Sequence, residues 1–174
     1  MNDLESVWNY CQNKLEVRKG AWRSAVLATD GEDGPEARTV IIREYQWPYI
    51  TFFSDSRTPK LKDLEREPRA CVVVYDPKKR VQVRLKGRAE VIRSGSELES
   101  ALNQIPERSR TDYRTTLAPG SRVKNDASAR KQAETVHFAL IRMELTKLDC
   151  LLLRTEGHSR AIFTGPEDGS WVVP

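Results

Sequence analysis

The sequence predicts a mainly β protein, an antiparallel β-barrel with helices inserted between groups of strands. Short runs rich in Val, Ile, Thr and aromatic residues recur along the chain, and turn-forming sequences such as Asp76-Pro77 separate them. Helical periodicity is confined to a few stretches between the strand groups. A strand-rich chain with short turns has to bury the apolar faces of its strands, and closure into a small barrel achieves this.

The first predicted element is a helix over residues 3–18, where apolar residues recur at helical spacing. Asn2 or Asp3 is placed to cap its start, and Gly20 is placed to end it. Nine strands are predicted after it, over residues 22–29, 37–45, 49–54, 69–75, 80–92, 137–145, 148–154, 160–164 and 170–173. Gly87 lies inside one of these runs, which indicates a bulge or the close approach of another backbone.

Between the third and fourth strands the period changes to that of a helix. Thr58 is placed to precede the helix as its N-cap, Pro59 suits its first position, and Leu61 and Leu64 fall on one face. Pro68 follows the last residue of this pattern and ends it.

Residues 95–117 are predicted to be helical in two pieces that break near Ile105-Pro106. Residues 118–135 form the most polar and loop-like stretch of the chain. We interpret this stretch as a surface connection, and a mobile segment beside a site is the alternative that the sequence leaves open.

Length and composition favour a single domain over residues 1–174. Hydrophobic residues make up 39% and charged residues 31% of the chain, which excludes a disordered or membrane-embedded protein. No apolar run is long enough to span a bilayer, and the N-terminal stretch lacks the apolar core of a secretory signal. We therefore expect a cytoplasmic protein that has no membrane partner.

The charge and the metal-ligating residue types restrict the function further. A formal net charge of +4 and a pI of about 9.0 suit an anionic ligand or nucleic acid equally. However, no basic run with interleaved aromatic residues is present, so we do not expect a nucleic-acid partner. The three cysteines are widely spaced and there are two histidines, so we expect no metal site.

Several polar side chains suited to an anion lie where predicted strands end. Thr58 and Lys60 flank the predicted helix start, where free N–H groups and the helix dipole favour negative charge. A hydroxyl, an ammonium group and backbone donors together suit a phosphate monoester. The alternative, which composition alone favours, is that Arg57 and Lys60 only solvate the helix start.

Three other polar residues lie on predicted strands. Arg38 and Arg43 are five residues apart on one strand, so alternation places them on opposite faces unless a bulge intervenes. Gln82 lies on the face opposite its two neighbouring valines, and its amide group suits the edge of a heterocycle. An ordinary solvent-facing residue is the alternative at this position.

Three motifs, in this order, resemble those of the FMN-binding split barrels related to pyridoxamine 5′-phosphate oxidase. RTVIIR (38–43) is similar to the family's arginine-opened strand, and FFSDSRTPK (52–60) is similar to its aromatic strand and phosphate turn. QVRLKGRAE (82–90) matches its Gln-Val-x-x-x-Gly-x-Ala-Glu strand. The resemblance implies a six-stranded antiparallel barrel of the Greek-key type and an FMN-dependent oxidoreductase.

The resemblance also implies which groups contact the cofactor. The side chains at the FMN phosphate are those of Arg38, Thr58 and Lys60. The side chains at the isoalloxazine are those of Arg43 and Gln82, and the main-chain groups along the ring and ribityl chain belong to Val40, Ile41, Phe53 and Ser54. Family members are typically homodimers with FMN at the subunit interface, so the resemblance implies that two chains complete each site.

The chain departs from the oxidase proper at several positions. Pro59 stands where that enzyme has a phosphate-binding arginine, and the neighbouring Arg57 is the candidate replacement. Ile162 falls where another arginine is expected, and the substrate-binding Tyr, Arg and Ser have no counterparts in residues 95–115. The substrate is therefore an unidentified small molecule, and pyridoxamine phosphate is not the expected one.

Two further alternatives remain open from the sequence. One is a flavin-binding protein without catalytic turnover. The other is a relative that holds haem or a deazaflavin in the same barrel, and His137 and His158 are the only histidines available as haem ligands.

Overall fold

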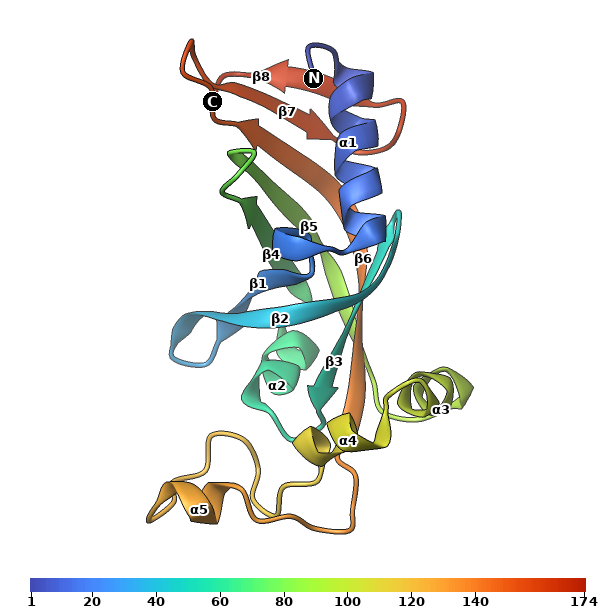
Figure 1. Ribbon diagram of the computed structural model, residues 1–174, viewed down its shortest axis with the longest axis vertical. Coiled ribbons are helices and arrows are strands. Elements are labelled where there is room, and N and C mark those ends of the chain that lie inside the picture. The colour runs from blue at the N-terminus through green and yellow to red at the C-terminus, as the bar shows by residue number, and fades with distance from the viewer.

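The chain folds into a closed six-stranded antiparallel barrel that carries two further strands and several helices (Figure 1). The computed structural model describes residues 1–174. The strands are β1 (Ser24–Gly31), β2 (Gly34–Gln46), β3 (Tyr49–Asp55), β4 (Arg69–Asp76), β5 (Val81–Ile92), β6 (Phe138–Leu152), β7 (Ser159–Phe163) and β8 (Gly169–Val172). The helices are α1 (Leu4–Val17), α2 (Pro59–Arg66), α3 (Ser96–Asn103), α4 (Glu107–Arg110) and α5 (Asp126–Ala129), with 3₁₀ turns η1 (Gly20–Trp22) and η2 (Thr111–Tyr113).

The strand order around the barrel is β3-β2-β1-β4-β5-β6, and a pairing between β3 and β6 closes it. Strand β6 pairs with β5 along its length, with β3 over its first half and with β7 over its second half. Strands β7 and β8 therefore continue the sheet beyond the closed barrel. The predicted six-stranded antiparallel barrel is confirmed.

Alternate strand residues point into the barrel, where they contribute to a single core of 30 buried residues. Helix α1 packs against this core, beside β7 and β8 (Figure 1). Asp3 caps the helix by accepting a hydrogen bond from the Ser6 backbone N–H at 2.8 Å. The predicted helix is confirmed, but Arg18, with a φ of 49°, takes the left-handed C-cap position in place of Gly20. None of the helices has the length and hydropathy that crossing a bilayer requires.

Predicted strand boundaries are wrong in three places. Strand β2 begins at Gly34, three residues before the predicted start. The first strand begins at Ser24, because Trp22 lies in the 3₁₀ turn η1. The predicted break between two strands near Thr146 is a bulge inside β6: Leu145 pairs with Gly87 and Lys147 with Lys86, so Thr146 is the extra residue. The same region explains the glycine in β5, since a Cβ on Gly87 would lie 2.0 Å from the carbonyl oxygen of Glu144.

A smaller apolar cluster lies outside the barrel, where the segment from α3 to η2 covers the outer face of β3 and β6. Its buried members are Ala101, Ile105, Tyr113, Phe138 and Leu140. The two-piece helix predicted for residues 95–117 is present as α3 and α4, which separate at Pro106, but it ends earlier, at η2.

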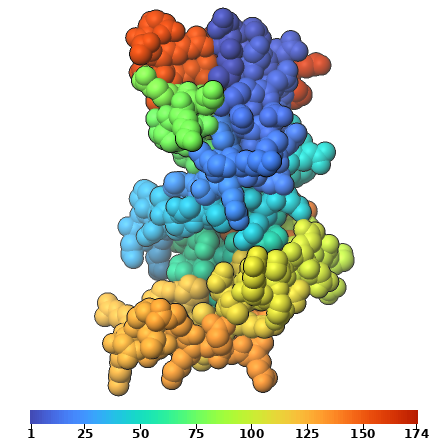
Figure 2. Space-filling model, viewed as in Figure 1, coloured from blue at the N-terminus to red at the C-terminus, as the bar shows by residue number.

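Residues 114–135 leave the barrel as a long excursion at the end of the molecule opposite α1 (Figures 1 and 2). Two backbone hydrogen bonds close its base, from Thr116 N to Lys131 O at 2.8 Å and from Ala133 N to Arg114 O at 2.6 Å. Apart from the four-residue helix α5, the excursion is irregular, as predicted for residues 118–135.

Candidate functional site

A polar groove of about 860 Å³ opens beside the N-terminus of α2. One wall is the tip of the β1–β2 hairpin, a second is the start of α2, and a third comes from Pro119 and Gly120 in the excursion. The groove is lined by all three predicted phosphate ligands, Arg38, Thr58 and Lys60. We refer to it as the α2 groove.

Arg38 extends from β2 into the α2 groove, and the buried carboxylate of Asp63 orients its side chain. Its Nη1 donates to Thr29 Oγ1 at 2.6 Å, and that hydroxyl donates to Asp63 Oδ2 at 3.1 Å. Asp63 Oδ2 also lies 3.7 Å from Arg38 Nη2. Thr29 and Asp63 are not among the predicted site residues, although the sequence carries a signal for them: alternation in β1 and helical spacing in α2 turn both polar residues toward the interior.

Lys60 lies half-buried in the same groove, and no carboxylate is within ion-pair distance of its ammonium group. Burial, followed by the positive charge of Arg38, lowers the pKa of Lys60 below its ordinary value of 10.5, while Asp55 acts in the opposite direction. Arg38 and Lys60 line the groove beside the N-terminus of α2, and two cations at a helix N-terminus form a donor set that fits a phosphate monoester.

Two buried hydroxyls lie next to these cations. Ser54 Oγ and Thr58 Oγ1 are 3.0 Å apart, and each can donate to the Asp55 carbonyl oxygen, at 3.1 and 3.0 Å respectively. Thr58 is the residue before α2, as predicted, but its side chain makes no hydrogen bond to the helix N–H groups. Of the two, Thr58 lines the groove, and because a hydroxyl hydrogen rotates freely, it can turn toward an anion there.

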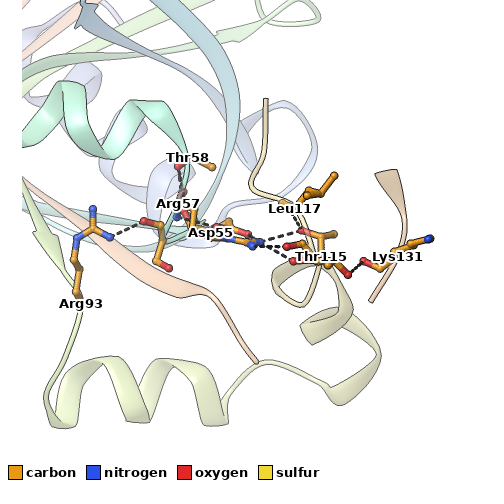
Figure 3. Close-up of polar contacts among 10 residues, drawn as sticks. Asp55, Arg57, Thr58, Arg93, Thr115, Leu117 and Lys131 are labelled. Atoms are coloured by element: carbon orange, nitrogen blue, oxygen red, sulfur yellow. Dashed lines mark hydrogen bonds and ion pairs between the residues drawn. The ribbon is translucent and has the colours of Figure 1, made fainter. Parts of the chain in front are cut away.

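Arg57, the candidate replacement for the arginine expected at Pro59, lines the α2 groove, and its guanidinium is held by neighbouring residues. Its guanidinium donates to both carboxylate oxygens of Asp55 and to the carbonyl and hydroxyl oxygens of Thr115 (Figure 3). Asp55 is 6% exposed, and its charge compensates that of Arg57.

The backbone edges next to this groove are open on one side. Strands β2 and β3 pair only from Ile42 and Phe52 toward their connecting turn. On the other side of that point, Val40 and Ile41 pair only with β1, and Phe53 and Ser54 pair only with β6. The four residues predicted to present main-chain groups to the cofactor therefore line the place where the barrel wall splits.

Arg43 lies on the outer side of this split. It is the extra residue where the β2–β3 register shifts between Ile42 and Glu44, and its guanidinium carbon lies 4.8 Å from the centre of the Phe53 ring. Arg38 shares the face of the buried Val40, so the two arginines point to opposite faces, as alternation predicts.

Gln82 is not brought to the α2 groove of its own chain. It lies on the outward face of β5, which is three strands from β2 in the six-stranded barrel and therefore on the opposite wall. The outward face beside it carries Arg84 and Arg160, which both donate to the buried carboxylate of Asp149. Burial alone would raise the pKa of Asp149, but the hydrogen bonds from Arg160 and Arg84 outweigh it and lower the pKa below 3.8.

Comparisons with known proteins agree with this architecture. The sequence profile of the pyridoxamine 5′-phosphate oxidase family matches residues 17–143. A pyridoxine/pyridoxamine 5′-phosphate oxidase from Cupriavidus pinatubonensis is 27% identical over 160 residues, which cover 84% of this chain and 75% of that protein. The enzyme of the same name from Thermobifida fusca is 49% identical over 49 residues, which cover 28% of this chain and only 22% of the relative's length.

A solved structure shares the whole fold. The pyridoxamine 5′-phosphate oxidase-related, FMN-binding protein of Nostoc punctiforme superimposes with a TM-score of 0.77 at 21% identity, covering 100% of this chain and 99% of that one. The barrel, its split wall and its polar groove thus define a split-barrel protein of the class that includes flavin-binding proteins. The chain belongs to the pyridoxamine 5′-phosphate oxidase family.

Proposed function

We propose that this protein binds FMN and acts as an FMN-dependent oxidoreductase on a small-molecule substrate. The observation that carries the proposal is the pair of cations in the α2 groove, Arg38 and Lys60: Arg38 lies 3.7 Å from Asp63 and 3.8 Å from Glu36, whereas no carboxylate is within ion-pair distance of Lys60. A phosphate dianion would relieve the repulsion between them. Family membership and the FMN-binding relative from Nostoc support the identity of the anion.

In this proposal the phosphate is held by Arg38, Thr58 and Lys60, with the Ser54 hydroxyl beside them. Asp63 and Thr29 fix the direction of the Arg38 guanidinium and so reduce the ordering that binding requires. FMN, when bound, supplies the capacity to accept and release a hydride.

The open backbone edges beside the groove would line the ring and ribityl chain. These edges belong to Val40 and Ile41 on one strand and to Phe53 and Ser54 on the other. Arg43, which stacks on the Phe53 side chain, would place a fixed positive charge beside the isoalloxazine.

We further propose a homodimer in which each FMN lies at the subunit interface. Gln82 and Arg38 are on opposite walls of one barrel, so a single chain does not present both to one ligand. The outward face that carries Gln82 also exposes apolar side chains: Tyr75, its pairing partner on β4, is 47% exposed, and Val26 on β1 is 41% exposed. A second copy packed on this face would cover these side chains and bring its Arg38 toward Gln82.

The test is a titration of the purified protein with FMN and with riboflavin, which lacks the phosphate, followed by the visible spectrum of the complex. Lys60→Ala is expected to weaken FMN binding about 100-fold, because a partly buried charge pair of this kind is worth about 2–3 kcal/mol. Riboflavin binding should change little.

Lys62→Ala is the matched control, because Lys62 lines the same groove from the same helix but is exposed. It should leave both affinities within about threefold of the wild type. A wild-type protein that binds no FMN, or that purifies with a haem or deazaflavin spectrum, would contradict the proposal.

A further inference from the structure

Arg57 lines the α2 groove, and its guanidinium connects Asp55 with the excursion (Figure 3). On one side, its Nε and Nη2 donate to the two carboxylate oxygens of Asp55 at 3.1 and 2.8 Å. Toward the excursion, Nη2 donates to Thr115 O at 3.0 Å and to Thr115 Oγ1 at 3.1 Å, and Nη1 donates to Thr116 O at 3.4 Å. Each nitrogen of the guanidinium thus has an acceptor within the protein.

Asp55 connects the same guanidinium to the start of α2. Its carbonyl oxygen accepts hydrogen bonds from the Thr58 hydroxyl at 3.0 Å and from the Thr58 backbone N–H at 3.2 Å. Its carboxylate accepts hydrogen bonds from the Arg57 side chain and from the Arg57 backbone N–H, each at 2.8 Å. One buried residue therefore fixes the predicted phosphate turn through its main chain and Arg57 through its side chain.

The excursion returns to the groove shortly after the residue that Arg57 binds. Thr115 is held a second time by a hydrogen bond from its hydroxyl to Leu117 O at 3.0 Å. The next residues lead to Pro119 and Gly120, which form the third wall of the groove. The contact between Arg57 and Thr115 therefore links the segment that leads to this wall with the turn that carries Thr58.

We propose that Arg57 is a positioning residue that holds the Pro119–Gly120 wall at a fixed place relative to the phosphate-binding side chains, without touching the phosphate itself. This inference rests on the proposed FMN site. The planar fork of the guanidinium is essential to the role, because it reaches a carboxylate on one edge and carbonyl oxygens on the other. A lysine at the same position keeps the charge and loses this double reach.

The first experiment measures amide hydrogen exchange of peptides covering residues 114–133 in the ligand-free protein. Arg57→Lys should speed exchange there about tenfold, which corresponds to a loss of about 1.4 kcal/mol. Arg93→Lys is the matched control, because Arg93 holds the same turn from its other side, donating to Ser56 O at 2.6 Å, without touching the excursion. Wild-type exchange rates in Arg57→Lys would overturn the proposal.

Thr115→Val provides a second variant should Arg57→Lys fail to fold, since it keeps the branched shape and removes the hydroxyl, which accepts from Arg57 and donates to Leu117 O. It should speed exchange in the same peptides about tenfold, in line with the loss of two hydrogen bonds. Unchanged exchange in a folded Thr115→Val protein would overturn the proposal by the same reasoning.

The second experiment separates positioning from direct binding by comparing two variants. Thr115 contacts Arg57 but does not line the groove, so a displaced wall should weaken FMN binding in Thr115→Val as well as in Arg57→Lys, about three- to tenfold in each. A loss in Arg57→Lys with wild-type FMN affinity in Thr115→Val would make Arg57 a phosphate ligand and overturn the proposal. If the wild type binds no FMN, the FMN function is wrong, and the exchange rates of the ligand-free variants still decide the role of Arg57.

Discussion

Two clusters of cations on this barrel differ in how their charge is compensated. In the α2 groove, Arg38 and Lys60 face a polar opening, and the pKa of Lys60 is lowered because burial and the neighbouring arginine disfavour its charge. On the outward face of β5 and β6, Arg84 and Arg160 share one buried acceptor, Asp149. The first cluster is arranged for an anion that arrives, whereas the second already contains its anion.

The comparison shows that counting basic residues does not locate an anion site. Both clusters contain two cations near predicted ligand-binding residues, and both include an arginine on a strand of the same sheet, Arg38 on β2 and Arg84 on β5. What separates them is the position of the carboxylates. Asp149 accepts hydrogen bonds directly from both of its arginines, whereas the carboxylates of Asp63 and Glu36 lie 3.7 and 3.8 Å from Arg38 and none is within ion-pair distance of Lys60. An incoming anion therefore gains more at the groove.

The largest expected effect comes from removing the internal anion of the second cluster. Asp149→Asn keeps the shape of the side chain but leaves two half-buried arginines without a counter-charge. We expect the free energy of unfolding to fall by about 2–3 kcal/mol, somewhat less than for a fully buried pair, because the arginines are partly exposed. Urea unfolding monitored by circular dichroism measures this.

The pH dependence of the same measurement has a definite sign. Because the folded-state pKa of Asp149 lies below its ordinary value of 3.8, its stabilising effect is fully present above that pH and disappears as the pH falls through the lowered pKa. The difference between wild type and Asp149→Asn should therefore shrink in acid. Glu67→Gln is the control, since Glu67 pairs with the exposed Arg69, and its removal should leave stability at neutral pH unchanged. Equal stability of Asp149→Asn and wild type would refute the distinction between the clusters.

The second prediction concerns the first cluster and alkaline pH. Lys60 has to be charged to bind a phosphate, and its pKa lies below 10.5, so FMN affinity should start to fall before that pH is reached. We expect a drop of about tenfold across the transition, the size of one charge-assisted hydrogen bond. Fluorescence titration of FMN from neutral to alkaline pH measures the drop.

A guanidinium stays protonated over this range, so Lys60→Arg should abolish the alkaline drop, whereas Lys62→Arg should retain it. If the drop in FMN affinity persists unchanged in Lys60→Arg, another group causes it, and the prediction that Lys60 must be charged to bind the phosphate is wrong.

The sequence predicts the local elements of the fold well because local chemistry determines them. Asp3 caps α1, and Thr58-Pro59 begins α2, each at the expected residue. The expectation of two strands around Thr146 is wrong because a polar pair between apolar runs is typical of a turn, and only the pairing with β5 shows that it is a bulge.

The candidate site is predictable in its residue types but not in its grouping. The motifs indicate Arg38, Thr58 and Lys60, and these do line one groove. The opening between β2 and β3 depends on where two strands stop pairing, and the engagement of Arg57 depends on Thr115, which is 58 residues away. Neither feature has a local signal, because both arise only when distant segments pack.

The smallest expected effect tests whether Gln82 of one chain and Arg38 of the partner chain contact the same FMN across a dimer interface. Gln82→Leu should weaken FMN binding about three- to fivefold, as expected for one neutral hydrogen bond. Co-expression of Gln82→Leu with Arg38→Ala, on differently tagged chains, then distinguishes the two arrangements. If Gln82 serves the partner's groove, the mixed dimer has one site with both lesions and one intact site, so half of its sites should bind FMN with wild-type affinity. If Gln82 serves its own chain, every site carries one lesion, the tightest sites bind three- to fivefold more weakly than wild type, and the shared-site dimer is wrong.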